Sequence, residues 1–307
     1  MAVSTVKVVI NGQTYNLSYN STSGKWEGTV TAPGVTSYNV NSGHYYPVTV
    51  TATDQAGNTT TKNDTDSTLG SSLKLIVKET TKPTVAVISP ASGARVTNSK
   101  PTISFQLRDE TNGSGINISS LTLKIDGGSA IGNTATGMTC TSVTGGYNCS
   151  YVCQTALAQG SHTITVDIKD NDGNQASTSS LTFTVDTVPP VLNITAPTNN
   201  LITNKSSVTV SGTVSDATSS PVSVAIKLNG VDQGAVTVTS GSFSKALTLA
   251  EGSNTILVTA TDSAGLTTSI ARTVVLDTGA PNITAVSITP NPANSGATLT
   301  ISVVVSD

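Results

Sequence analysis

Acidic residues recur along this chain at one fixed spacing, and their carboxylates are the side chains best suited to chemistry. The pairs that lie 30 residues apart are Glu79 and Asp109, Asp186 and Asp216, and Asp277 and Asp307. The first acid of each pair opens a junction that continues with Thr, two further residues and Pro, as in KETTKP, VDTVPP and LDTGAP. Carboxylates bind hard cations, transfer protons or cap backbone N–H groups, so their chemistry depends on which groups the fold brings beside them.

A nine-residue motif supplies a further acid at three places. It reads VTATDQAGN from residue 50, VDIKDNDGN from residue 166 and VTATDSAGL from residue 258. Apolar and polar residues alternate before the Asp, which predicts a strand. The Asp carboxylate can accept hydrogen bonds from the N–H groups of a tight turn, and the Gly supplies the positive φ that the turn needs. The motif therefore predicts hairpin turns at Asp170 and Asp262.

The strands that must position these acids form a repeated unit. Around the third motif, the short strand-like runs are 191–197, 207–216, 222–228, 235–239, 243–250, the motif itself and TSIARTVVLD. Seven short strands in about 90 residues are typical of an immunoglobulin-like β-sandwich. The chain is poor in charged residues (11%) and in aromatic residues (4%), and it shows no convincing helical period. We therefore predict an all-β protein of tandem immunoglobulin-like β-sandwich domains, arranged as beads or a rod.

The junctions divide the chain into four parts. The predicted domains are 1–81, 82–187, 188–278 and 279–307. Residues 1–81 align with the repeat from its third strand onward, so this part is either a trimmed sandwich or one whose open edge pairs with another chain. Residues 279–307 hold only two predicted strands, and we expect them to be the start of a further, incomplete domain.

Composition and motifs argue against several classes of function. A net charge of −3 offers no basic surface for nucleic acid, and no apolar run approaches the roughly 18 residues that a membrane-spanning helix needs. The two histidines, His44 and His162, lie in unrelated contexts without a nucleophile elbow or a zinc-binding spacing. We therefore predict a protein that is not an enzyme and that does not insert into a membrane.

The sandwich topology predicts where the acids meet. The entering chain, the loop after the second strand and the loop between the last two strands lie at the same end of such a domain. The expected groups are Asp186, Asp216 and Asp262 at one junction, and Glu79, Asp109 and Asp170 at the other, with Glu110 and Asp172 nearby. Three carboxylates repel one another unless a cation neutralises them, and Ca²⁺ accepts such oxygen ligands at flexible geometry. The alternative is that each acid caps its own turn or pairs with a lysine such as Lys169 or Lys205.

The cysteines all lie in the second predicted domain. A turn around Thr144 and Gly145 places Cys140 directly opposite Cys149, so a cross-strand disulfide is geometrically possible. Cys153 would then be free. In a reducing cytoplasm, three thiols are expected instead, and the sequence leaves both alternatives open.

The repeat resembles a known family. The junctions of the form D-T-x-x-P, the strand VSGTVSD, the stretch LAEGSNTILVTATDSAG and the strand SVAIKLNG are similar to bacterial immunoglobulin-like repeats. The resemblance covers residues 82–307. It implies stalks of bacterial adhesins or modules of tailed-phage virion proteins, and some related adhesin repeats are stiffened by Ca²⁺ between domains.

The N-terminus separates two hypotheses of function. The first twenty residues predict two strands joined at Asn11 and Gly12, without the features of a secretory signal. This favours a structural protein on the surface of a tailed-phage virion, attached to capsid or tail proteins through residues 1–81 and binding host-surface or mucosal glycans. Exposed Tyr45, Tyr46 and Trp26 are candidate glycan contacts, but Trp26 aligns with Phe243 and Tyr147, which favours a place in the core. The alternative is a stalk segment of an adhesin on the bacterial cell surface.

Overall fold

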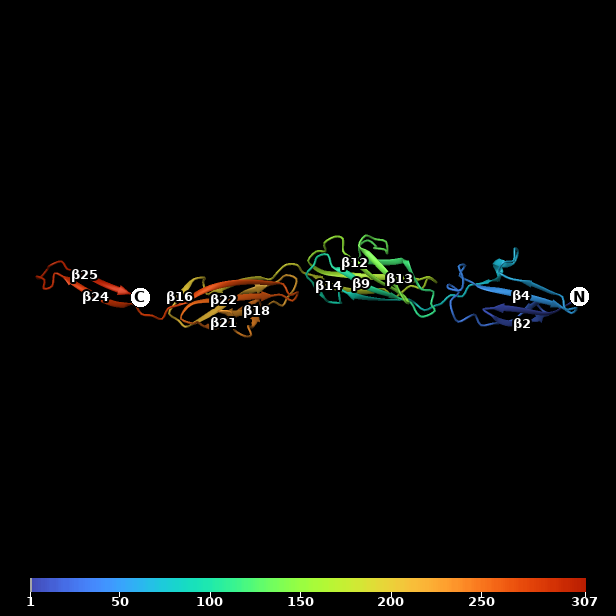
Figure 1. The fold of residues 1–307 in the computed structure, drawn as a ribbon, viewed down its shortest axis with the longest axis horizontal. Coiled ribbons are helices and arrows are strands. Elements are labelled where there is room, and N and C mark those ends of the chain that lie inside the picture. Colours follow the sequence, from blue (N-terminus) through green and yellow to red (C-terminus); the bar gives the residue numbers. More distant parts are fainter. Residues whose placement is uncertain (1) are drawn as a thin grey trace. The chain divides into compact units, whose positions relative to one another are not determined.

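The computed structural model describes residues 2–307, and its regular elements are strands apart from one short 3₁₀ turn (Figure 1). Residues 1–185 and 186–307 form two compact units. Within residues 2–307, no helix has the length and apolar character needed to cross a membrane. The all-β prediction is confirmed.

Module 1 is a single sheet. Its elements are β1 (Val3–Ile10), β2 (Gln13–Asn20), β3 (Lys25–Glu27), β4 (Tyr46–Asp54), β5 (Thr59–Lys62), η1 (Gly70–Leu73) and β6 (Lys74–Leu75). The strand order is β3-β2-β1-β4-β5, and β6 pairs with β4. Asn11 and Gly12 take positive φ values of 49° and 73°, which produces the predicted hairpin between β1 and β2.

Module 2 is a two-sheet sandwich. Its strands are β7 (Thr84–Ser89), β8 (Arg95–Val96), β9 (Thr102–Arg108), β10 (Ile116–Ile125), β11 (Met138–Val143), β12 (Gly146–Val152), β13 (Gly160–Asp170) and β14 (Ser179–Val185). One sheet has the order β10-β13-β14-β8 and the other β11-β12-β9-β7. The buried apolar core between them includes Phe105, Ile164 and Phe183.

Module 3 repeats the sandwich. Its strands are β15 (Val191–Ala196), β16 (Leu201–Thr203), β17 (Ser207–Ser215), β18 (Ser223–Leu228), β19 (Val231–Asp232), β20 (Val238–Thr239), β21 (Ser242–Thr248), β22 (Gly252–Thr261) and β23 (Thr267–Leu276). The sheets have the orders β15-β17-β21-β20 and β16-β23-β22-β18-β19. In β18, Val224, Ile226 and Leu228 are buried while the residues between them are exposed, which is the period of two that predicts a half-buried strand.

The C-terminal part forms one hairpin. Strands β24 (Asn282–Thr289) and β25 (Thr300–Ser306) pair with each other, and their apolar side chains are exposed. They occupy the place in the repeat that β15 and β17 hold in module 3, as expected from the alignment. The predicted domain boundaries as such stay predictions.

Module 1 reproduces half of the repeat. Its order β5-β4-β1-β2 corresponds to β23-β22-β18-β19 of module 3, so its sheet begins at the third strand of the unit. The clusters of buried apolar residues found in the described chain lie in modules 2 and 3. In module 1, the buried apolar side chains among the described residues are Val6 and Tyr46. The strands within residues 2–81 form one sheet, and a trimmed sandwich or an edge that pairs with another chain both stay predictions.

One of the three predicted glycan contacts is wrong, because its side chain is not on the surface. Tyr46 is buried, and its hydroxyl donates a hydrogen bond to the carbonyl oxygen of Val35. Tyr45 is half-buried, with the Lys74 Nζ atom 4.8 Å from its ring centroid. Trp26 is half-buried and packs against Tyr19. The Tyr46–Val35 bond connects the first residue of β4 to the loop that precedes it.

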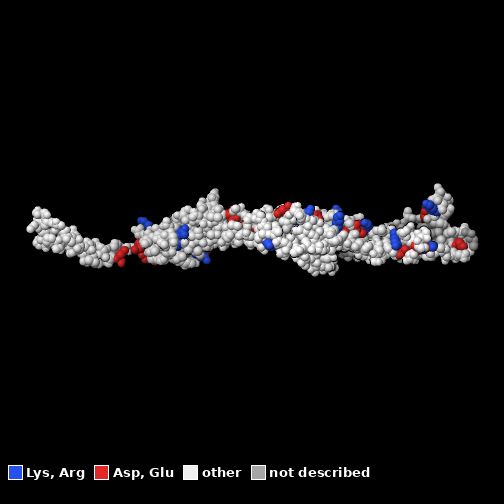
Figure 2. Space-filling view, turned by 90° about the horizontal axis from the view of Figure 1, so that it is seen from above, with Lys and Arg blue, Asp and Glu red and all other residues white. Residues whose placement is uncertain are grey.

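The charged side chains are sparse. Figure 2 shows isolated acidic and basic side chains on a surface that is mostly uncharged in this view. The view contains no large patch of either sign, in agreement with the low charged fraction of 11%.

Candidate metal centres in two acidic clusters

The structure brings together the acids that the spacing predicted. Carboxylate oxygens of Glu79, Asp109 and Asp170 lie within 4.8 Å of one another, and so do those of Asp186, Asp216 and Asp262. We call these the first and the second acidic cluster. Asp277, at the third junction, is exposed and accepts a hydrogen bond from the Gly279 N–H group.

Three separate segments build the second cluster. Asp186 immediately follows β14, Asp216 follows β17, and Asp262 lies in the turn between β22 and β23. Asp186 is completely buried and Asp262 is 6% exposed, whereas Asp216 is half-buried. Burial of carboxylates is costly unless their oxygens find partners.

Each carboxylate of the second cluster uses one oxygen for its own turn. Asp186 Oδ1 accepts a hydrogen bond from Val188 N at 3.1 Å. Asp216 Oδ1 accepts from Thr218 N at 2.8 Å and from Ser219 N at 2.5 Å. Asp262 Oδ1 accepts from Ala264 N at 2.8 Å and from Leu266 N at 2.9 Å. These bonds are the turn caps expected from the sequence.

Two of the remaining carboxylate oxygens are buried without a partner. Among the described residues, the Oδ2 atoms of Asp186 and Asp262 and the Oγ atom of Ser219 are buried and form no hydrogen bond. Buried polar atoms in folded proteins nearly always have a partner, so each exception requires an explanation. The two carboxylate oxygens come from distant segments and carry negative charge, and the hydroxyl adds a neutral oxygen, which together form a donor set for a hard cation such as Ca²⁺.

In the first cluster, too, some carboxylate oxygens accept hydrogen bonds and others have no partner. Glu79 Oε1 accepts from Ser114 N, and Asp109 Oδ2 accepts from Gly115 N at 2.7 Å. Asp170, only 1% exposed, spends both oxygens on Asn174, at 2.8 Å from the backbone N and 2.8 Å from Nδ2. In the described part of the chain, Glu79 Oε2, Asp109 Oδ1 and Glu110 Oε2 are buried without a partner.

Gly113 leaves the space in which these carboxylates meet. A Cβ atom at Gly113 would lie 2.7 Å from Asp109 Oδ2, 2.9 Å from Glu79 Oε2 and 3.0 Å from Glu110 Cδ. Glu110 therefore belongs to the first cluster, although the sequence placed it only nearby. Burial raises the pKa of Glu79, and the neighbouring Glu110 carboxyl raises it further.

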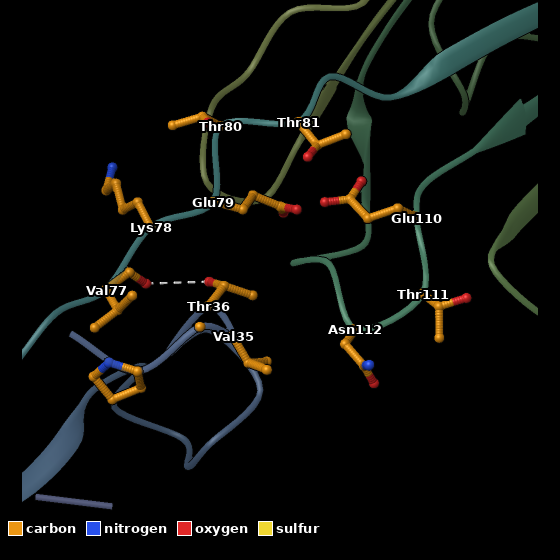
Figure 3. Close-up of a pocket in the computed structure, with 12 residues that line it drawn as sticks. Val35, Thr36, Val77, Lys78, Glu79, Thr80, Thr81, Glu110, Thr111 and Asn112 are labelled. Atoms are coloured by element: carbon orange, nitrogen blue, oxygen red, sulfur yellow. Dashed lines mark hydrogen bonds between the residues drawn. The ribbon is translucent and has the colours of Figure 1, made fainter. Parts of the chain in front are cut away.

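A cavity lies beside the first cluster. Its volume is about 430 Å³, and Glu79 and Glu110 line it together with residues 33–36 of module 1. Figure 3 shows the two carboxyl groups pointing toward each other across this space.

Lysine pairing does not occur at either cluster. In residues 2–307, the ion pairs are Lys62 with Asp66 and His162 with Asp126. The predicted alternative of a pair with Lys169 or Lys205 is therefore wrong, while the turn-cap alternative is correct for one oxygen of each acid in the second cluster. Within residues 2–307, neither of these ion pairs involves a carboxylate of the two clusters.

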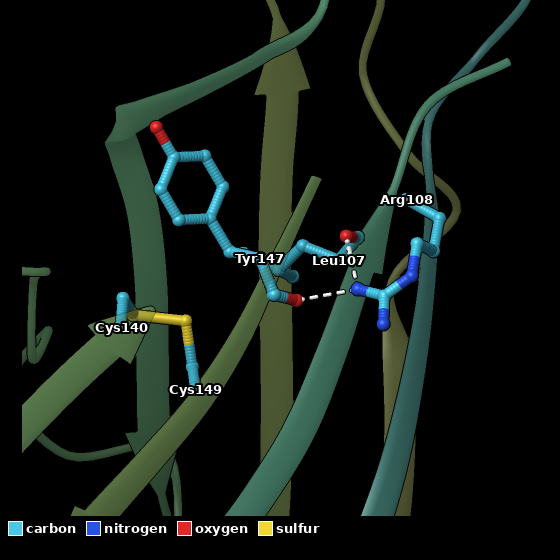
Figure 4. Close-up of a disulfide and its surroundings, with 5 residues drawn as sticks. All are labelled: Leu107, Arg108, Cys140, Tyr147 and Cys149. Carbon is cyan, nitrogen blue, oxygen red and sulfur yellow. Dashed lines mark hydrogen bonds between the residues drawn. A yellow bond between two sulfur atoms is a disulfide. The ribbon is translucent and has the colours of Figure 1, made fainter. Parts of the chain in front are cut away.

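The cysteines are partly bonded. Cys140 and Cys149 form a disulfide across β11 and β12, where they are directly opposite in register (Figure 4). Beside it, Arg108 donates to the carbonyl oxygens of Leu107 and Tyr147. Cys153 is free and buried, and burial raises the pKa of its thiol.

Comparisons with known protein families agree with this architecture. The model of the bacterial Ig domain matches residues 83–166, and that of glucodextranase domain B matches residues 190–278. These two segments are therefore immunoglobulin-like modules in tandem. Both matched domain types are non-catalytic Ig-like domains.

Individual relatives of these Ig-like modules include one curated protein. Bacillopeptidase F of Bacillus subtilis (strain 168) is 36% identical over 109 residues, which are 36% of this chain and 7% of that protein. This chain therefore spans only a small part of its relative.

Solved structures that match this chain share little sequence with it. The fibronectin(III)-like modules of Clostridium thermocellum CbhA match with 18% identity and a TM-score of 0.38, over 63% of this chain and 94% of that chain. Dimeric latent PorU from Porphyromonas gingivalis matches with 16% identity and a TM-score of 0.30, over 90% of this chain and 30% of that chain.

Proposed function

We propose that this chain is a non-catalytic spacer segment of a bacterial cell-surface or secreted protein, whose modules are braced by Ca²⁺ at the two acidic clusters. The observation that carries the proposal is the set of buried carboxylate oxygens without partners, contributed by separate segments. A Ca²⁺ ion takes 6–8 oxygens at about 2.3–2.6 Å, so waters and carbonyls would complete its shell.

The bacterial stalk has more support than the virion appendage. The bacterial Ig domain model and bacillopeptidase F both point to bacterial proteins, and the virion interpretation draws no support from them. The disulfide also favours an oxidising compartment outside the cytoplasm. Attachment through residues 1–81 and binding of surface glycans are separate proposals, and the spacer role requires neither.

The proposed ion acts by joining segments. At the second cluster it would connect the entering chain at Asp186, the loop at Asp216 and the β22–β23 turn at Asp262. Removing the ion leaves buried like charges close together, which favours separation of these segments. Binding to the folded state alone stabilises it by about 2.7 kcal/mol at a concentration of 100 Kd.

Calorimetry of the full chain tests this role. We expect Ca²⁺ to raise the unfolding midpoints relative to EDTA, and Asp186→Asn to remove the increase for module 3. Asp277→Asn is the matched control, because Asp277 occupies the same place at the third junction but is exposed and outside both clusters. Midpoints that are equal in Ca²⁺ and EDTA would refute the metal-braced spacer.

A further inference from the structure

The middle of the repeated turn differs in module 2. The turn reads DQAGN at residues 54–58 and DSAGL at 262–266, but DNDGN at 170–174. Asp172 therefore stands where the other two copies have alanine, Ala56 and Ala264. Turn formation itself does not need this carboxylate, because the other copies form the same turn with alanine.

Asp172 contacts both module 1 and the connecting segment. Its Oδ2 atom accepts hydrogen bonds from the Thr36 hydroxyl and from the Glu79 N–H group, the latter at 3.1 Å. Its own N–H group donates to Ser114 Oγ at 3.0 Å, and its carbonyl oxygen accepts from Lys78 Nζ at 3.3 Å. One turn residue thus bridges both modules and the segment that joins them.

The module 1 partner is a loop of polar residues, 36–39, which we call the docking loop. Thr36 and Ser37 are only 3% and 1% exposed. Ser37 exchanges hydrogen bonds with Val77, and Asn39 Nδ2 donates to the Gly113 carbonyl oxygen at 2.8 Å. Figure 3 shows Thr36 bonded to Val77 close to Glu79.

Both module 2 residues that the docking loop contacts, Asp172 and Gly113, lie in loops that carry acids of the first acidic cluster. Asp172 lies in the turn that holds Asp170, and Asn174 of that turn also donates to the Glu79 carbonyl oxygen at 3.2 Å. Gly113, which accepts from Asn39, forms the floor under three carboxylates of the cluster. Movement of either loop therefore changes the surface that receives module 1.

We infer that Ca²⁺ binding at the first acidic cluster fixes the docking loop of module 1 on module 2, and that Asp172 is the positioning residue that couples the two. The inference rests on the proposed Ca²⁺ binding. Without the ion, repulsion among Glu79, Asp109 and Glu110 loosens the loops that carry Gly113 and Asp172. With the ion, these loops are held in the arrangement that the docking loop requires.

Hydrogen exchange of the full chain, with Ca²⁺ or EDTA, tests the coupling. We expect Ca²⁺ to slow exchange in residues 34–44 by at least about ten-fold, the scale of a hydrogen bond to a charged group. Asp172→Ala, which restores the residue of the other copies, should abolish this slowing while calorimetric titration still detects Ca²⁺ binding. Asp172→Asn retains an acceptor oxygen and should restore part of the effect. Asp232→Ala, an exposed turn acid of module 3, is the control.

The outcomes separate this inference from the proposed function. If titration detects Ca²⁺ but exchange in residues 34–44 is unchanged, the coupling is wrong and the braced spacer stands. If no Ca²⁺ binds, both fail. If Asp172→Ala keeps the full slowing, Asp172 is not the coupling residue. Should that variant fold poorly, Asn39→Ala removes an exposed side chain's bond to Gly113 and must weaken the Ca²⁺-dependent slowing for the inference to hold.

Discussion

At the residue scale, the acids of this chain serve two purposes at once because a carboxylate has two oxygens. In the second cluster, one oxygen of Asp262 caps the turn and the other has no partner in the described residues. Asp54, in the module 1 copy of the same turn, directs both oxygens to the turn and to Asn58. The cap is thus general to the motif, but among its three copies only Asp262 keeps a buried oxygen without a partner, since Asp170 also directs both oxygens to Asn174.

His162 in module 2 is a buried histidine whose pKa is shifted by its neighbours. Its Nδ1 atom lies 2.7 Å from Asp126 Oδ2 and its Nε2 atom 2.9 Å from the Ala158 carbonyl oxygen. Burial opposes protonation of the ring, but the Ala158 carbonyl and the Asp126 carboxylate outweigh it and raise the pKa of His162. For Asp126, burial is outweighed by the Thr163 N–H group and by His162, so its pKa is lowered.

These shifts predict a pH window for module 2. A raised His pKa stabilises the fold below the unfolded value of about 6.5, and this stability is lost as the pH rises through the higher folded value. A lowered Asp pKa stabilises above about 4 and is lost as the pH falls further. The denaturant midpoint of module 2 should be higher for wild type than for His162→Gln. This difference should be largest near pH 5 and should decline above pH 6.5. A difference that stays constant from pH 5 to 9 would contradict the paired, protonated ring.

At the element scale, the β11–β12 hairpin is closed by the disulfide. Its two cysteines are separated by 9 residues. Closing a loop of about ten residues stabilises a fold by about 2–3 kcal/mol through restriction of the unfolded chain.

We therefore expect the double variant Cys140→Ala and Cys149→Ala to lower the unfolding free energy of module 2 by about 2–3 kcal/mol. Module 3 contains no cysteine, so its transition serves as an internal control in the same calorimetric scan. Reducing agent should reproduce the loss in wild type and leave the double variant unchanged. If reducing agent lowers the unfolding free energy of wild type and of the double variant equally, the disulfide does not stabilise the hairpin.

At the scale of the whole molecule, the sandwiches carry separate cores. Module 2 and module 3 each contain their own cluster of buried apolar residues. Cooperative unfolding follows the contacts of a core, so modules with separate cores are expected to unfold in separate transitions.

Matched core truncations test this independence. Ile226→Ala in module 3 and Ile164→Ala in module 2 each remove a fully buried side chain. Each should lower the unfolding free energy of its own module by about 2–5 kcal/mol and leave the other transition in place. Calorimetry of the full chain measures both, and a shift of both transitions by one substitution would show that the cores are coupled.

The sequence by itself determined the strands, the turns and the meeting of the acids. Strand alternation and turn residues act over a few neighbours, so runs such as SVAIKL and the repeated turn could be interpreted directly. The repeat then gave the topology, and the topology placed Asp186, Asp216 and Asp262 at one end of a module. The predicted turn around Thr144 and Gly145 put Cys140 opposite Cys149, although the sequence left the formation of the disulfide open.

Only the tertiary structure decided which atoms remain without partners and which groups join the clusters. The free oxygens, the inclusion of Glu110, the burial of Tyr46 and the contact of Asp172 with Thr36 depend on segments far apart in the chain. Sequence periodicity describes which face of a strand a residue occupies, but not which distant group lies opposite it. The physical reason is that burial and hydrogen bonding of a side chain are set by packing between elements, which has no local sequence signal.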